Sequence, residues 1–225
     1  MRNQLLRDRG DMNGIFKAIE DGDLQAISSI VLKEPGVLNN CVSESGLSPL
    51  MRAICEMERS YEIIELLVRS GADVNAATKD GYTPLHLNMD LNGPSGTGEL
   101  PYRVARLLKD HGADTEARNH YGWTPLLRAA LEGSGDEFKA LLEIGAKYDV
   151  EYPAHSMPVF TRGRALASIV MMYPEKIRAL LAAGFKPTSS LVSEAESSLA
   201  GAKDPDSSYS KGIRESLGLI RDRVR

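Results

Sequence analysis

Pairs of leucines recur along the chain inside stretches whose apolar residues follow helical spacing. The stretches are IIELLVRSGADVNA at 63–76, VARLLKDHGADTEA at 104–117 and FKALLEIGAKYDV at 138–150. Apolar residues at intervals of three and four lie on one face of a helix. A glycine directly after such a run is typical of a helix end. The pattern therefore predicts three amphipathic helices that end at Gly71, Gly112 and Gly145.

A second block precedes each of these helices. It reads SGLSPL at 45–50, DGYTPLH at 80–86 and YGWTPLL at 121–127. Serine or threonine directly before proline marks a helix start, because the hydroxyl caps the helix and proline lacks an N–H that would otherwise be unpaired. Glycine earlier in the block suits a tight turn. These turn glycines are 35 and 41 residues apart, so a helix–turn–helix unit repeats three times.

Weaker versions of the unit flank these three. Residues 13–40 contain NGIFKAIEDGDLQAISSIV, and residues 150–189 keep the leucine pair and a closing glycine but lack the Thr-Pro-Leu block. In the later segment either Pro158 or the Gly163-Arg164 region starts the first helix, and Pro174 opens the second. Two further helices, over 188–202 and 208–225, are expected to cover the exposed end of the array.

The matched blocks resemble the ankyrin-repeat family, whose period is about 33 residues and whose signature is Thr-Pro-Leu-His-x-Ala. The resemblance implies an all-α solenoid of about five helix–turn–helix repeats with short hairpin-like fingers and a C-terminal helical cap. We expect residues 1–12 to be an N-terminal extension and 190–225 to be the capping helices. The repeats themselves would occupy 13–40, 41–75, 76–116, 117–149 and 150–189.

Composition narrows the function classes. Hydrophobic residues make up 42%, charged residues 26%, and the net charge is −4, so a protein that mainly neutralises phosphate is not expected and nucleic acid is an unlikely partner. The excess of arginine in the final helix is interpreted as favouring the helix dipole, in preference to a contact with nucleic acid or a membrane. Cys41 and Cys55 are expected to be small buried side chains in a reducing compartment. Without a membrane-length apolar run or a signal peptide, the chain is expected to be cytoplasmic. We also expect it to be a monomer.

Candidate chemistry is sparse. The four histidines occur singly, and no metal-ligand or nucleophile motif is present, so we expect no catalytic residues, no metal and no cofactor. The glycine-rich segment 92–101 lacks the Lys-Ser/Thr pair of a phosphate loop. It belongs instead to an insertion at 88–101 that lengthens the third repeat by eight residues relative to the fourth. This insertion is either functional or a tolerated surface loop.

The resemblance also implies where a partner would bind, on the concave surface made by the finger tips and the first helices. Tyr82, Tyr121 and Trp123 are aromatic where the repeat has no need of an aromatic residue, although Trp123 can also be interpreted as packing on the neighbouring finger. Asn88 and Met89 replace a small Ala-Ala pair and interrupt the groove. The candidate protein-binding residues are Leu47, Lys79, Tyr82, His120, Tyr121, Trp123, Arg128 and Leu131.

These observations favour a non-enzymatic protein-interaction module, either a scaffold or an adaptor. An inhibitor or immunity-type protein that blocks a partner enzyme fits the same features. A targeting module of an effector or enzyme complex is a third interpretation.

Overall fold

The structure is a computed structural model that describes residues 14–40, 42–43, 46–56, 60–88, 99–151, 153–155 and 163–224. The expected extension at 1–12 and most of the insertion at 88–101 lie outside these ranges. The chain divides into two compact units, Met1–Asp114 and Thr115–Arg225, here called the first and second unit. Within the described residues the chain is helical and forms no strand, apart from one isolated bridge between Glu151 and Ala165.

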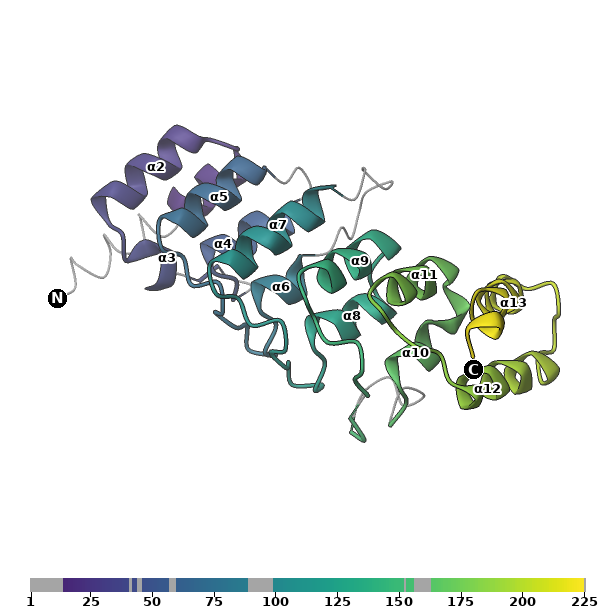
Figure 1. Cartoon of the computed structure of the whole chain (residues 1–225). Helices are drawn as coiled ribbons and strands as arrows, with labels where there is room; N and C mark the ends of the chain where they lie inside the picture. The colour runs from purple at the N-terminus through teal and green to yellow at the C-terminus, as the bar shows by residue number, and fades with distance from the viewer. Residues whose placement is uncertain are drawn as a thin grey trace. The chain divides into compact units, whose positions relative to one another are not determined.

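In the first unit the chain forms consecutive helices joined by turns (Figure 1). Residues 14–20 are helical. The helices that follow are α2 (Leu24–Lys33), α3 (Val37–Asn40), α4 (Pro49–Cys55), α5 (Tyr61–Arg69), α6 (Pro84–Leu87) and α7 (Glu99–Asp110). Helix α4 packs on α5, and α5 packs on α7.

The second unit continues with paired helices and ends in two longer ones (Figure 1). Its elements are α8 (Pro125–Leu131), α9 (Gly135–Glu143), α10 (Leu166–Ile169), the 3₁₀ turn η2 (Val170–Met172), α11 (Pro174–Ala182), α12 (Ser189–Ala200), α13 (Ser208–Ile220) and the 3₁₀ turn η3 (Arg221–Arg223). Helix α9 packs on α8 and α11, and α13 packs on η2, α11 and α12.

The predicted helix starts are confirmed. Pro49, Pro84 and Pro125 open α4, α6 and α8. The Ser48 hydroxyl accepts from the Met51 N–H at 3.3 Å. The N-terminal cap of α6 involves a histidine: Nδ1 of buried His86 accepts from the Thr83 N–H at 3.2 Å. Pro174 opens α11 as expected, whereas the short helix before it starts at Leu166, directly after the Gly163-Arg164 region.

The fingers are tight turns rather than hairpins of paired strands. In the finger at 78–82 the Thr78 N–H donates to the Tyr82 carbonyl at 3.0 Å, and the Gly81 N–H donates back to Thr78 at 2.9 Å. The same pair of bonds closes the fingers that begin at Ser43 and Asn119. The finger glycine has a φ of 81° at Gly81, which a residue with a Cβ atom rarely adopts. This explains why glycine recurs at that position.

Side chains bridge the loops of neighbouring repeats. In the first unit Asn39 donates to the Gly71 carbonyl at 3.0 Å and accepts from the Asp73 N–H at 2.8 Å. Asn75 makes the corresponding bonds to Gly112 and Asp114 at 2.9 and 2.8 Å. In the second unit the equivalent bond runs from the Lys147 N–H to a carboxylate oxygen of Glu116, at 3.0 Å.

The core of each unit consists of aliphatic side chains from the repeated helices, such as Leu67 and Leu108 in the first unit and Leu126 and Leu180 in the second. One buried lysine is an exception. Lys176 is 2% exposed, and its Nζ donates to the carbonyls of Ala129, Ala130 and Gly133 at 3.0, 2.9 and 2.8 Å. The ammonium group therefore bonds to carbonyls at and just beyond the C-terminal end of α8, where the regular pattern of helical hydrogen bonds runs out.

The two C-terminal helices form as predicted and cover the end of the second unit. Thr188 caps α12 by accepting from the Leu191 N–H at 3.2 Å. On α13, Ile213, Leu217 and Ile220 are buried. Gly212 brings the backbone of α13 very close to η2, because a Cβ atom at this position would overlap the Met172 carbonyl oxygen and lie 2.9 Å from its carbon.

Two expectations about buried residues need correction. Cys55 is exposed rather than buried, because it is the last residue of the short helix α4; Cys41 lies outside the described residues. Asn88, which was expected to interrupt the groove, is only 5% exposed, and its amide donates to the Pro101 carbonyl at 2.8 Å. It therefore ties the end of α6 to the first turn of α7. Met89 lies outside the described residues.

Candidate protein-binding site

The finger at 119–123 holds three of the candidate residues in the second unit. Asn119 is 4% exposed, and its Oδ1 accepts from the N–H groups of Tyr121 and Trp123, both at 3.0 Å. The rings of these two residues lie 5.6 Å apart at an angle of 40°. Tyr121 is 39% exposed, and the neighbouring His120 is exposed as well. The finger therefore presents a tyrosine from a backbone fixed by a buried amide.

Trp123 is not part of the exposed tip. Its side chain is 5% exposed, which favours the packing interpretation and removes the indole as an open contact surface. The next loop also covers this finger, since a Cβ atom at Gly122 would lie 2.6 Å from Pro153 and 3.2 Å from the His155 ring. Trp123 is thus a buried packing residue of this finger, while Tyr121 and His120 are exposed.

The two candidates on α8 are only partly accessible. The Arg128 side chain is 11% exposed and its Nε donates to Glu132 at 2.9 Å. Leu131 is half-buried at the end of the helix. Sequence reasoning placed Arg128 on the surface but did not foresee that an acid one helical turn away would hold its guanidinium.

In the first unit the finger at 78–82 has the same construction. The Thr78 hydroxyl accepts from the Tyr82 N–H at 3.1 Å, as Asn119 does for its own finger. Tyr82 is half-buried and its ring lies edge-on to His86 with centroids 5.8 Å apart, whereas Lys79 is exposed at the tip. Leu47, on the preceding finger, is half-buried.

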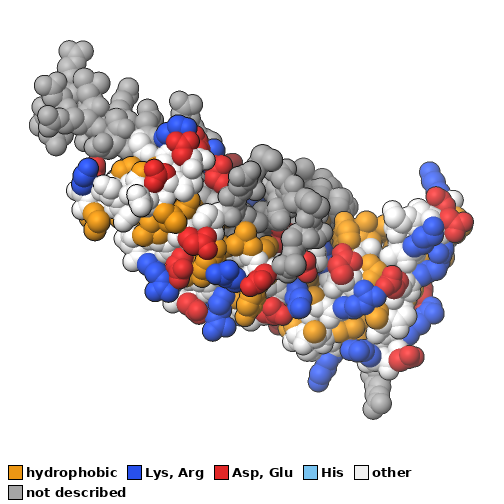
Figure 2. Space-filling view, turned by 90° about the horizontal axis from the view of Figure 1, so that it is seen from above, with side chains coloured by type: hydrophobic (Ala, Val, Ile, Leu, Met, Phe, Trp, Pro, Cys, Tyr) orange, Lys and Arg blue, Asp and Glu red, His pale blue; other side chains and the backbone are white. Residues whose placement is uncertain are grey.

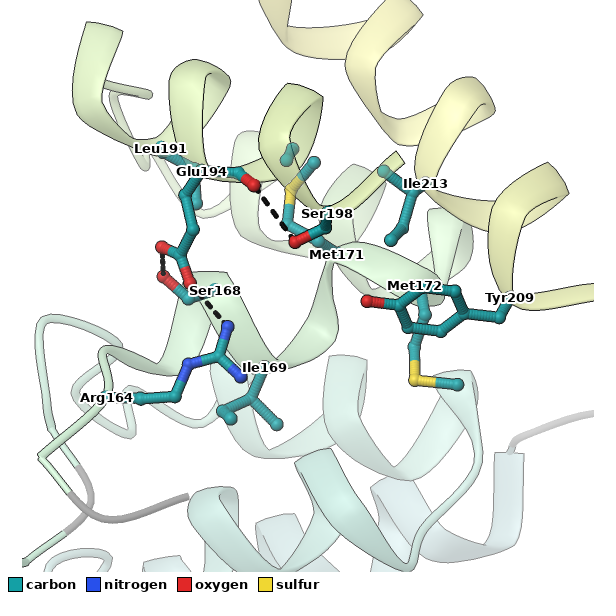
Figure 3. Close-up of a pocket in the computed structure, with 11 residues that line it drawn as sticks. Arg164, Ser168, Ile169, Met171, Met172, Leu191, Glu194, Ser198, Tyr209 and Ile213 are labelled. Carbon is teal, nitrogen blue, oxygen red and sulfur yellow. Dashed lines mark hydrogen bonds and ion pairs between the residues drawn. The ribbon is translucent and has the colours of Figure 1, made fainter. Parts of the chain in front are cut away.

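A hollow that the sequence did not reveal lies in the C-terminal part of the second unit, between α10, η2, α12 and α13 (Figure 3). Its volume is about 170 Å³. A second hollow of about 380 Å³ adjoins it and shares Arg164, Ser168, Leu191 and Glu194. The first hollow is lined by Arg164, Ser168, Ile169, Met171, Met172, Leu191, Glu194, Ala195, Ser198, Tyr209 and Ile213.

An ion pair separates the two hollows. Arg164 Nη2 lies 2.5 Å from Glu194 Oε1, and the Ser168 hydroxyl donates to Glu194 Oε2 at 2.7 Å. Ser198 donates to the Glu194 backbone carbonyl at 2.9 Å. The two charged residues are 30 positions apart in sequence, and neither belongs to a recurring block, so no motif pointed to them.

The described surface carries charges of both signs. On the face shown in Figure 2, basic and acidic side chains are interspersed with small apolar areas across the described residues. Among those residues, no group of three or more His, Cys, Asp or Glu side chains could hold a metal ion. No helix of the described part is long and apolar enough to cross a membrane.

Comparison with protein families identifies the repeated fingers and helix pairs. Residues 15–93 match the family model described as ankyrin repeats, in three copies. Ankyrin repeats are protein–protein interaction modules, and the family is typically not enzymatic. The match covers the fingers at 43–47 and 78–82, and the finger at 119–123 beyond it has the same turn bonds. Residues 15–93 therefore carry ankyrin repeats, and the described part of the chain has an all-α fold built from helix pairs and capped by two C-terminal helices.

Proposed function

We propose that this chain is a scaffold or adaptor that binds a partner protein through its finger tips and first helices and carries out no chemistry itself. The observation that carries the proposal is the construction of the finger at 119–123. Tyr121 is 39% exposed on a backbone fixed by Asn119, which is itself buried. A tyrosine held in place loses little conformational entropy on binding, and tyrosine is enriched at interface hot spots.

The remaining candidates contribute around each tip. His120 is exposed beside Tyr121 in the second unit, and Lys79 is exposed beside Tyr82 in the first. Trp123 contributes through its ring contact with Tyr121 rather than by touching the partner. Leu47, Arg128 and Leu131 are half-buried and would add contact area at the edges.

The division into five repeats, the monomeric state and a cytoplasmic location are parts of the same proposal. The described helices fit repeats at 41–75 and 117–149, each of which contains two helices. Size-exclusion chromatography with light scattering tests the monomer, and cell fractionation tests the location.

The binding surface is tested by affinity purification with mass spectrometry on the wild-type chain and on the variants Tyr121→Ala and Tyr82→Ala. The matched control is Tyr61→Ala, because Tyr61 is half-buried on the second-helix side of its repeat, where its ring contacts Arg103 at 3.8 Å. We expect the specific partner to be lost or strongly depleted with both finger variants and kept with the control. Equal recovery of the partner with all three variants would contradict the proposal.

The role of the interaction is tested on the partner once it is captured. A scaffold or adaptor leaves the intrinsic activity of the partner unchanged when the chain is added in excess. Stoichiometric loss of that activity would replace the adaptor proposal by the inhibitor interpretation.

A further inference from the structure

The hollow beside α12 has the size of one apolar side chain. Its volume is about 170 Å³, and most of its wall is apolar, with Met171 and Met172 contributed by η2 and Ile213 by α13. An apolar cavity of about 150 Å³ accommodates a molecule of benzene, whereas drug-sized ligands occupy roughly 300–1,000 Å³. Methionine side chains also adapt their shape to an incoming group. The hollow therefore fits a side chain such as leucine rather than a cofactor.

One end of the hollow holds a guanidinium group that is paired with a glutamate and still partly exposed. Both carboxylate oxygens of Glu194 are occupied, one by Arg164 and one by Ser168. Arg164 is 37% exposed in its side chain, and among the described residues Glu194 is its one carboxylate partner. A guanidinium group has five N–H donors, so it can bind a second carboxylate beside the first.

A hydroxyl group faces the same space from another helix. Tyr209 lies on α13, and Figure 3 shows its hydroxyl pointing into the hollow, across from Arg164 and Glu194. The residue is 42% exposed, so a ligand can reach the hydroxyl from solvent. A phenolic and a guanidinium donor that face one space beside apolar side chains are complementary to a group that carries its anion next to an apolar side chain.

Arg164 lines the same hollow as the apolar side chains, which favours a C-terminal α-carboxylate over an acidic side chain as the group that it binds. In an extended peptide, neighbouring side chains point to opposite faces, so an acidic side chain next to an apolar anchor would point away from Arg164. The α-carboxylate of a C-terminal residue is attached to the same Cα atom as the anchoring side chain. The adjoining hollow of about 380 Å³, lined by Phe185, Thr188 and Ser190 among others, has room for the residues that precede it.

We propose that this hollow binds the free C-terminus of a partner chain that ends in an apolar residue of leucine size. The α-carboxylate contacts Arg164 and Tyr209, and the last side chain lies between Met171, Met172 and Ile213. This site goes beyond the proposed function, because it involves none of the finger residues and its test does not depend on them.

Binding is measured on the full chain by NMR of methionine ε-methyl groups labelled with ¹³C, with the signals assigned from Met171→Leu and Met172→Leu. N-acetyl-leucine is the probe, since it carries the side chain and the carboxylate of a C-terminal leucine. We expect it to shift the two methionine signals at millimolar concentration. N-acetyl-leucinamide, which lacks the carboxylate, should bind about tenfold more weakly, as expected for one lost charge-assisted contact.

Three variants separate this proposal from nonspecific binding. Arg164→Gln should lower the affinity for N-acetyl-leucine to that of the amide, and Ala195→Leu should abolish binding by filling the hollow. The matched control is Arg178→Gln, because Arg178 is an exposed arginine on α11 that also pairs with a glutamate, Glu215. This control should bind the probe like the wild-type chain.

Several results would overturn the proposal. These are the absence of any shift at Met171 and Met172, equal affinity for the acid and the amide, or unchanged binding by Arg164→Gln. Equal binding of acetyl-Ala-Leu-Glu-Ala-amide, which offers only an internal acid, would reject the C-terminal carboxylate as the ligand. None of these outcomes bears on the finger surface, so the two proposals can fail separately.

Discussion

Two glycines on α13 have opposite surroundings, and alanine should therefore have opposite effects at the two positions. At Gly212, a Cβ atom would overlap the Met172 carbonyl oxygen and lie 2.9 Å from the carbonyl carbon. At Gly218, six residues along the same helix, a Cβ atom would meet no atom within 4 Å. Gly212→Ala and Gly218→Ala thus change the same chemistry in the same helix and differ in packing alone.

Two effects of the added methyl group determine the change in the free energy of unfolding, namely helix propensity and packing. Replacing glycine by alanine inside a helix stabilises the folded state by about 0.5–1 kcal/mol. At Gly212 this gain is opposed by overpacking, which costs about 1–3 kcal/mol and belongs at the upper end here because the obstacle is backbone that no rotamer change can move. We expect Gly212→Ala to lower the free energy of unfolding by about 1–2 kcal/mol and Gly218→Ala to raise it by about 0.5–1 kcal/mol.

The measurement is urea-induced unfolding followed by circular dichroism, with the midpoints of both variants compared with that of the wild-type chain. In a thermal scan, 1 kcal/mol corresponds to about 2–4 °C in Tm for a chain of this size. The two variants should move the midpoint in opposite directions. If Gly212→Ala is as stable as Gly218→Ala, the close approach of α13 to η2 does not exist in solution, and the reasoning is refuted.

Three further predictions concern other parts of the chain. Burial lowers the pKa of Lys176 from 10.5 to about 8, so the folded state loses this proton at a lower pH than the unfolded state does. The free energy of unfolding should therefore rise between pH 8 and 10.5, by up to about 3 kcal/mol. Unfolding of Lys176→Met, measured over the same pH range, should lack this rise. Asn75→Ala removes the bonds to Gly112 and Asp114 and should cost about 1–2 kcal/mol in urea unfolding; an unchanged midpoint would show that these exposed bonds contribute nothing. Cys55 is exposed, so in a Cys41→Ser variant its thiol should react with a disulfide reagent in the native state; a thiol of this variant that reacts only in urea would contradict the placement of Cys55.

The helices could be predicted from sequence because the features that start and end them are local. Proline at the first turn of α4, α6 and α8 determines each start without reference to the rest of the chain. The helix pair within 150–189 was harder to place, since the short helix at Leu166 has neither proline nor a side-chain cap. Its start depends on packing, which a single sequence does not display.

The candidate site was predictable only in part. The Thr-Pro-Leu blocks located the fingers, and the finger at 119–123 does expose Tyr121. The blocks could not show that Trp123 is buried, because burial depends on neighbours far along the chain. For the same reason the sequence concealed the amide of Asn88 bonded to Pro101, and the pairing of Arg164 with Glu194.

The bridges between neighbouring loops make certain backbone amides reporters of repeat docking. The N–H groups of Asp73, Asp114 and Lys147 donate to a side chain from the preceding loop. Their exchange with deuterated solvent therefore requires two adjacent repeats to separate, even when the helices on either side stay folded. A carboxylate can accept but not donate, so the bridge from Glu116 cannot also hold a carbonyl as the asparagines do. Local opening along the array can thus be followed one repeat junction at a time, at single amides.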